Sequence, residues 1–287
     1  MKIVYSFKEI AKQLGEEYEK QNPPDFITHL NYVKCLEAIS KDISLDTSLS
    51  IEKAIECNIN VKNKVNLIKL TLDSLEQEKV LIQKNPEYAV VCVSWISVKA
   101  YYVIFNMCLL LKYLVTCNKD AFNSTHSSVL GWLKDHIERK EILFSDEKFN
   151  RLVNIREALK LKIKSGSNIK RSPVDVEERL TQIFKKLANY SIEEFRRTNR
   201  IKTLHNKKSK AMYSKYIDES FISLFDFFYW YRIKANYRDL EYLNKDIHDE
   251  QFKEYFLSYY GLLVNLYKPL GVLINKIAMV RIGHNII

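Results

Sequence analysis

The chain has 287 residues, of which 47% are hydrophobic and 28% charged, so it can bury a full core and is not an intrinsically disordered chain. Six glycines and five prolines are too few for the many corners of a β-rich fold, and the sequence is rich in helix formers, so we expect an all-α protein. The net charge of +10 is typical of proteins that bind polyanions, most commonly nucleic acid or an anionic membrane face, although solvated lysines alone give the same balance.

Cysteine usage and hydropathy indicate a reduced, cytoplasmic protein. The cysteines are widely spaced and form no C-x-x-C pair, so we expect free thiols and no zinc site; they are Cys35, Cys57, Cys92, Cys108 and Cys117. The N-terminal residues lack the apolar stretch of a secretory signal. The longest apolar run, residues 100–115, is interrupted by Asn106 and Lys112, so we expect no membrane span.

Start and stop signals combined with a 3.6-residue apolar period predict a succession of helices. In chain order they cover residues 6–20, 25–40, a segment starting at 51, and residues 61–83, 87–116, 126–138, 145–164, 174–202, 217–243 and 248–280. Residues 165–173, rich in Ser and containing Gly166, are predicted to be a linker. Residues 202–215 are polar and basic, and we predict a loop there.

Three short sequences occur in one order along the chain. They are K-A-Y-Y-V-I-F at residues 99–105, T-H-S-S-V at 125–129 and R-I-K-A-N-Y at 232–237. This order resembles the HEPN superfamily, helical bundles of prokaryotic toxin and defence systems and of nucleotidyltransferase-associated proteins. The resemblance covers about residues 55–165 and 218–280. It implies an all-α, HEPN-like helical bundle at 55–287, with an N-terminal helical extension at 1–54 and a basic helical insertion at about 165–217.

The resemblance also implies a chemistry. Active members of the superfamily are metal-independent endoribonucleases with an Arg-x4–6-His motif, and two protomers pair to form the cleft. Here Arg200 and His205 have that spacing, so Arg200 is expected to neutralise the scissile phosphate and His205 to transfer protons. RNA supplies the nucleophile, its 2′-hydroxyl. Trp230 and Ala235 occupy the aligned positions of the usual arginine and histidine, as in the non-catalytic branch of the superfamily.

The segment around this motif is strongly basic. Residues 196–216 contain eight Lys or Arg and no acidic residue. Such a segment is expected to bind the phosphate backbone of RNA, and Tyr213 and Tyr216 are expected to stack on unpaired bases. The residues predicted to bind RNA are Arg196, Arg197, Lys202, Lys207, Lys208, Lys210, Tyr213 and Lys215. A flexible, solvated loop without a specific role is the alternative for this segment.

Three functional hypotheses follow. The first is an RNA-binding HEPN-like protein of a toxin–antitoxin or antiviral defence system, active as a homodimer or with a protein partner, with or without metal-independent RNA cleavage. Its ribonuclease form requires Arg200 and His205 to lie close together at a charged cleft. The second is a non-catalytic helical module that docks a partner protein or a nucleotidyltransferase, which requires an exposed aromatic surface at residues 225–230. The third is a helical scaffold with no role in nucleic-acid binding. The sequence has no H-E-x-x-H, P-loop or G-x-G-x-x-G motif, so we expect no metal and no cofactor.

Overall fold

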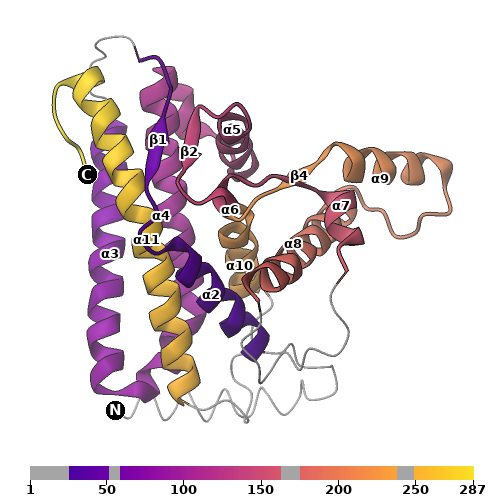
Figure 1. Ribbon diagram of the computed structural model, residues 1–287, viewed down its shortest axis with the longest axis horizontal. Coiled ribbons are helices and arrows are strands. Elements are labelled where there is room, and N and C mark those ends of the chain that lie inside the picture. Colours follow the sequence, from indigo (N-terminus) through magenta and orange to yellow (C-terminus); the bar gives the residue numbers. More distant parts are fainter. Residues whose placement is uncertain (1–25, 52–58, 163–174, 238–248) are drawn as a thin grey trace.

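A computed structural model of the chain describes residues 26–51, 59–162, 175–237 and 249–287 (Figure 1). Nearly all regular structure in these ranges is helical, which confirms the all-α class. The longer helices are α2 (Phe26–Ser40), α3 (Ile59–Lys84), α4 (Ala89–Thr116), α5 (His126–Glu138), α8 (Val176–Thr198), α9 (Lys207–Glu219), α10 (Phe225–Tyr237) and α11 (Asp249–Ile282). The short elements are η1 (Pro86–Tyr88), η2 (Lys119–Asn123), α6 (Glu147–Asn150), α7 (Ile155–Lys160), β1 (Leu45–Thr47), β2 (Ile142–Phe144), β3 (Val153–Asn154) and β4 (Phe221–Ile222).

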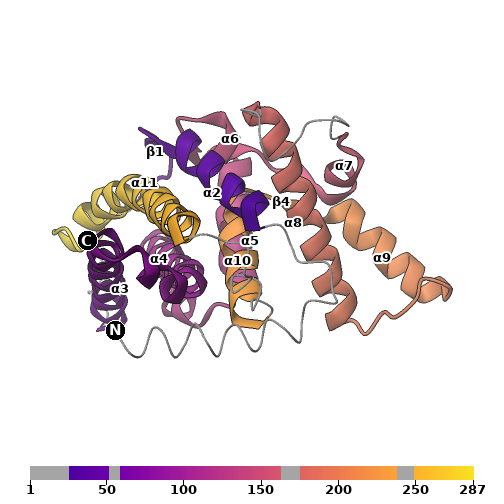
Figure 2. The same ribbon diagram turned by 90° about the horizontal axis from the view of Figure 1, so that it is seen from below.

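Helix α4 is the centre of the core. Apolar residues lie on almost every side of it, and α11, α10, α3 and α5 pack around it (Figure 2). The helix ends where Cys117 adopts the left-handed conformation, with a φ of 55°. Arg281 of α11 holds this end, because its Nε donates to the Leu114 carbonyl at 2.9 Å and its Nη2 to the Val115 carbonyl at 3.0 Å.

Two helical stretches, Pro86–Thr116 and Glu250–Ile282, are long and apolar enough to cross a membrane. About half of each apolar window, 56% and 50%, is buried inside the protein. Core helices of soluble proteins share this length and composition. The absence of a membrane span therefore stays a prediction.

The core continues through segments that the sequence assigned to an extension and an insertion. Helix α2, from the expected extension, packs on α11 and α8 and buries Phe26 and Val33. Helix α8, from the expected insertion, has a strong apolar stripe that includes the buried Leu180, Phe184 and Leu187. Both helices are thus parts of the same hydrophobic core as α4.

Two small antiparallel sheets join distant parts of the chain. In one, β1 pairs with β2 so that Leu45 lies opposite Phe144; in the other, β3 pairs with β4 so that Val153 lies opposite Ile222. The second sheet shows that two predictions were wrong. The single helix predicted at 145–164 is divided into α6, β3 and α7, and the helix predicted from residue 217 starts only at Phe225, because residues 221–222 form β4.

Other predictions have clear outcomes. The predicted helices at 25–40, 61–83, 87–116, 126–138 and 248–280 are confirmed within a few residues. The loop predicted at 202–215 is wrong in its second half, which belongs to α9. The predicted helix at 6–20, most of the helix expected from residue 51 and the linker at 165–173 lie outside the described residues.

Candidate nucleic-acid interface

The basic segment begins at the turn that ends α8. The Arg200 N–H donates to the Arg197 carbonyl at 3.1 Å, and the Ile201 N–H donates to the Arg196 carbonyl at 2.8 Å. These two bonds form a Schellman motif, in which Arg200 has a left-handed φ of 53°. Because Ile201 is buried and Arg200 is exposed, the turn presents the Arg200 side chain to solvent.

Helix α9 projects from the body of the molecule in both views (Figures 1 and 2). Asn206 caps its first turn by accepting a hydrogen bond from the Lys208 N–H at 2.8 Å. The C-terminal half is anchored, because Tyr216 stacks on Phe195 of α8 at a centroid distance of 4.0 Å and Ile217 is buried. The N-terminal half, which carries three lysines, has exposed and half-buried residues and none that is buried.

Most positive charges of this segment lack an acidic partner. Arg197 pairs with Glu194 at 2.7 Å, and Lys215 lies 3.9 Å from Glu219. Five exposed residues form no ion pair within the described chain: Arg200, Lys202, Lys207, Lys208 and Lys210. We call the following residues the basic surface: Arg196, Arg197, Arg200, Lys202, Lys207, Lys208, Lys210 and Lys215.

An open depression of about 460 Å³ lies at the α8 end of the basic surface. Its lining residues are Glu193, Arg196, Arg197, Arg200, Ile201 and Lys202. Four of these side chains are cationic and one is anionic, so the depression carries an excess of positive charge. Arg196 helps to shape it, since its Nη2 donates to the Lys202 carbonyl at 3.0 Å.

Both residues predicted to be catalytic are exposed to solvent. Arg200 lines the depression, whereas His205, in the loop before α9, is not among the residues that line it. No hydrogen bond joins the two side chains in the part of the chain that the structure describes. Their catalytic pairing therefore stays a prediction.

The two tyrosines predicted to stack on bases have different surroundings. One face of the Tyr216 ring is covered by Phe195, and its hydroxyl lies 2.6 Å from Ser191 Oγ. Tyr213 is half-buried against the core, so part of its ring is open to solvent. Base stacking in this segment is thus better placed at Tyr213 than at Tyr216.

The three short sequences that carry the HEPN resemblance meet in space between α4, α5 and α10. The Tyr101 hydroxyl is hydrogen-bonded to Nδ1 of His126, the first residue of α5. Arg232 of α10 donates through Nη1 to the Tyr102 hydroxyl at 3.3 Å, and its guanidinium lies 5.0 Å from the Tyr101 ring centre and 5.4 Å from that of Tyr229. We call these five residues the Tyr–His–Arg cluster. Four of them, all except Tyr229, were named from the sequence as signs of a resemblance and were not assigned to a site.

Burial is the main cause of the pKa shifts in the cluster, and the Arg232 charge is the second. Burial lowers the pKa of His126, and the nearby Arg232 charge lowers it further, so the imidazole is neutral at pH 7. Burial raises the pKa of Tyr101, so its hydroxyl keeps its proton. Arg232 Nε is buried and has no hydrogen-bond partner among the described residues. The cluster is thus a cation surrounded by neutral, polar aromatic side chains.

The phenylalanines and the tryptophan at residues 225–230 of α10 do not form an exposed surface. Phe225, Phe227 and Phe228 are at most 2% exposed, and Trp230 is 9% exposed. They pack inside the chain, for example where Trp230 meets Tyr190 of α8 at a centroid distance of 6.2 Å. The expectation of an exposed aromatic surface at residues 225–230, on which the interaction-module hypothesis depended, is wrong.

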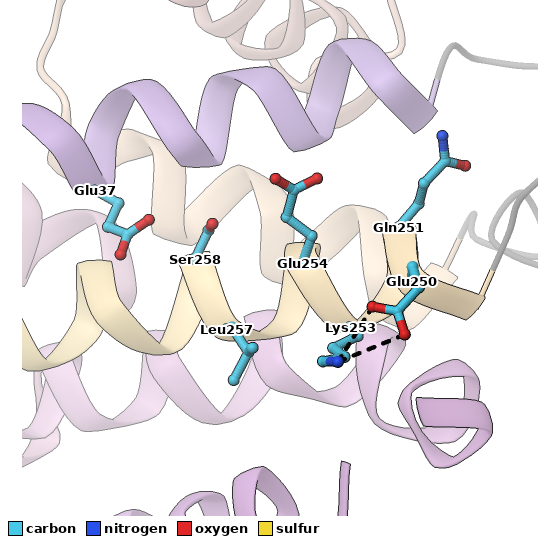
Figure 3. A pocket seen from close by; sticks show the side chains of 7 residues that line it. All are labelled: Glu37, Glu250, Gln251, Lys253, Glu254, Leu257 and Ser258. Atoms are coloured by element: carbon cyan, nitrogen blue, oxygen red, sulfur yellow. Dashed lines mark hydrogen bonds and ion pairs between the residues drawn. The ribbon is translucent and has the colours of Figure 1, made fainter. Parts of the chain in front are cut away.

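A second pocket, of about 430 Å³, lies between α2 and the start of α11 (Figure 3). Three of its seven lining residues are glutamates and one is a lysine, so its net charge is negative. Two of the carboxylates are partly neutralised, since Glu250 lies 3.2 Å from Lys253 and Glu254 pairs with Lys34. Such a lining repels phosphate. Nor do the described residues contain three or more His, Cys, Asp or Glu side chains grouped to hold a metal ion.

The described cysteines are all free, as predicted, and burial raises the pKa of Cys92 to about 12, so this thiol stays protonated.

No protein-family model, curated protein or solved structure matches the chain. Membership of the HEPN superfamily therefore stays a prediction from the three short sequences.

Proposed function

We propose that the chain is an RNA-binding, HEPN-like protein that holds the RNA backbone on its basic surface. The observation that carries the proposal is the exposure of five cationic side chains without acidic partners along α9 and the preceding turn. Cations that no acid neutralises attract polyphosphates, and each phosphate they bind releases counterions. The adjoining depression supplies a concave place for the backbone, lined by Arg196, Arg197 and Arg200.

The resemblance to the HEPN superfamily favours RNA over DNA as the ligand. The same resemblance suggests a role in a toxin or antiviral defence system, with a homodimer or a nucleotidyltransferase partner. The exposed aromatic surface that the interaction-module hypothesis requires is not present at residues 225–230, because Phe225, Phe227, Phe228 and Trp230 are buried. No observation favours a second function strongly enough to stand beside RNA binding.

The binding test compares two variants with the same loss of charge. In the first, Lys207, Lys208 and Lys210 on α9 become alanine; in the second, three exposed lysines of α3 become alanine: Lys62, Lys69 and Lys84. Labelled single-stranded RNA is titrated with each protein at a fixed salt concentration. We expect the α9 variant to bind more weakly and the α3 variant to bind like the unchanged chain. If both variants lose RNA affinity equally, the effect comes from net charge alone, and the proposed RNA-binding surface is overturned.

Cleavage is a separate part of the proposal. In the proposed reaction the 2′-oxygen attacks phosphorus and expels the 5′-oxygen, giving a 2′,3′-cyclic phosphate; the 2′-hydroxyl gives up its proton and the 5′-oxygen gains one. His205 would transfer protons and Arg200 would neutralise the phosphate. The test is incubation with labelled RNA in EDTA beside His205→Ala. Cleavage that persists in the variant excludes this role for His205, and binding without cleavage leaves the RNA-binding function alone.

A further inference from the structure

We infer that the Tyr–His–Arg cluster binds one nucleotide of a single-stranded RNA, holding its phosphate at Arg232 and stacking its base on Tyr102. The inference rests on the proposed RNA binding and adds to it a defined nucleotide site, distant in sequence from the basic surface. It starts from Arg232, whose guanidinium has aromatic neighbours and no acidic partner among the described residues.

Arg232 has a buried hydrogen-bond donor and a positive charge that the described residues leave unpaired. Its Nε is buried without a hydrogen-bond partner in the described chain, and a buried donor that stays unpaired is costly. Contact with three tyrosine rings stabilises the charge but leaves the N–H unsatisfied. An oxyanion is the ligand that satisfies both the charge and the donor, and a planar guanidinium is suited to phosphate.

Two further donors lie beside Arg232. The Tyr101 hydroxyl keeps its proton and is hydrogen-bonded to His126 Nδ1, and in the arrangement that we infer it donates to this nitrogen. The proton of the neutral imidazole is therefore on Nε2, where it is available to a ligand. The Tyr102 hydroxyl accepts from Arg232, so its own proton is free to donate as well. Arg232, His126 and Tyr102 thus offer N–H, N–H and O–H donors, and the Tyr102 and His126 ring centres lie 6.3 Å apart.

The start of α5 adds to this preference for an anion. His126 is the first residue of a 13-residue helix, whose N-terminus carries partial positive charge. Thr125, Ser127 and Ser128 are exposed at the same end and carry hydroxyl groups. The unsatisfied Arg232 Nε and the helix end are independent features that select the same kind of ligand.

The aromatic surface identifies the ligand as a nucleotide. Tyr102 is 37% exposed, and Trp95, seven residues earlier on the same face of α4, is 56% exposed. Exposed aromatic rings next to a cation are the usual platform for unpaired bases, because every base has a stacking face. A base of duplex RNA is not accessible in this way, so the site selects single strands.

The cluster and the basic surface are also neighbours. Helix α10 packs on α8 where Trp230 meets Tyr190. Tyr229 of the cluster is within electrostatic reach of Arg197 and Glu194 near the end of α8, which contribute to its pKa shift after burial and Arg232. A strand held on the basic surface therefore has a short path to the cluster.

In the experiment the full chain is titrated with adenosine 5′-monophosphate, inorganic phosphate, adenosine and a single-stranded RNA 12-mer. Binding of the two phosphates is followed by ³¹P NMR, and binding of the nucleoside by calorimetry. The variants are Arg232→Gln and the triple lysine variant of α9. Arg151→Gln is the matched control, because Arg151 also lies over an aromatic ring, that of Phe184, at 5.4 Å. Thermal unfolding monitors the fold, and Arg232→Lys provides a second variant that keeps the charge but loses Nε.

We expect the monophosphate to bind more tightly than inorganic phosphate or adenosine, and Arg232→Gln to weaken it about 10- to 100-fold, in line with a charged hydrogen bond. Arg151→Gln and the triple lysine variant should leave monophosphate binding unchanged. If Arg232→Gln and a folded Arg232→Lys bind monophosphate as the unchanged chain does, or if no monophosphate binds, the nucleotide site is excluded. In that event RNA binding that still depends on the α9 lysines would leave the proposed function intact. RNA that binds none of the proteins would overturn the proposed function itself.

Discussion

The hydroxyl group of Tyr101, from the middle of the central helix α4, is hydrogen-bonded to the ring of His126, at the start of α5. Tyr101 is 1% exposed, so this bond fixes the imidazole from the core side and leaves its other edge toward solvent. Phe105, one turn along α4, packs against the same imidazole at a centroid distance of 4.6 Å. The orientation of His126 is therefore set by α4 and not by α5 alone.

Tyr101→Phe removes this bond and keeps the ring. We expect a loss of about 1–2 kcal/mol in the free energy of unfolding, because His126 Nδ1 loses its hydrogen-bond partner. Urea denaturation measures the change. Tyr267→Phe is the control, since the described structure records no hydrogen bond for that hydroxyl, and it should change stability little. Equal effects in both variants would mean that the Tyr101 bond has no net value.

The stability of the protein should depend on the protonation of His126. Its pKa is below the ordinary value of 6.5 in the folded protein, through burial and then the Arg232 charge, so the unfolded chain binds the proton more tightly. This contribution to stability is fully present above pH 6.5 and is lost as the pH falls from 6.5 through the folded pKa. The charged and titratable groups that face the imidazole are Tyr101, Tyr102, Tyr229 and Arg232.

The measurement compares the chain with His126→Gln by urea denaturation at pH 7.5 and at pH 5. Glutamine keeps a polar group but does not titrate. We expect the unchanged chain to lose more stability on acidification than the variant. Parallel losses would show that other groups, and not His126, determine the acid sensitivity.

The sequence predicted helices where local signals and tertiary structure agree. Helix α5 begins where predicted because Thr125 accepts a hydrogen bond from the Ser128 N–H at 3.3 Å, which is a local cap. Residues 202–215, which include most of α9, were predicted as a loop because they are polar and basic. The helix forms because the Asn206 cap and the contacts of its second half stabilise it.

Features that depend on distant residues were out of reach. Strand β3 exists because it pairs with β4, and Asn154 reinforces this by donating to the Asp218 carbonyl at 2.8 Å, 64 residues away. The contact of Arg232 with Tyr102 joins positions 130 residues apart. Periodicity and composition describe single helices, so the Tyr–His–Arg cluster could not be assembled from them.

Lys134 of α5 and Asp226 of α10 form an ion pair that is largely shielded from solvent. Lys134 Nζ lies 3.3 Å from the Asp226 carboxylate, which also accepts from the Ser223 N–H at 2.7 Å; Asp226 is 6% exposed. Lys134→Met leaves this carboxylate without its cation, and we expect a loss of about 2–4 kcal/mol in the free energy of unfolding. Lys253→Met, which removes a more exposed pair with Glu250, should cost less than about 1 kcal/mol. Chemical denaturation measures the free energy of unfolding of both variants. Equal losses would contradict the argument that the buried pair contributes more than the exposed one.

Arg200→Gly distinguishes the contribution of the Arg200 side chain to RNA binding from the contribution of its backbone to the turn. The left-handed φ of 53° favours glycine, so the substitution relieves backbone strain while it removes the cation. We expect the free energy of unfolding to stay level or rise by up to about 1 kcal/mol. RNA binding should weaken, because one lining cation of the depression is lost. A stable variant with unchanged RNA affinity and unchanged cleavage would exclude Arg200 from the interface.

The salt dependence of RNA binding gives a count of the phosphates held by α9. For a single strand, the slope of the logarithm of the affinity against the logarithm of salt concentration changes by about 0.7 for each phosphate neutralised. If Lys207, Lys208 and Lys210 each neutralise one phosphate, replacing all three with alanine reduces the slope by about 2. The α3 variant lacking Lys62, Lys69 and Lys84 removes the same formal charge from another exposed face, so its slope should match that of the unchanged chain. If the α9 variant and the unchanged chain have the same slope, the lysines of α9 attract RNA at long range without contacting its phosphates. The interface would then consist of the arginines at the end of α8.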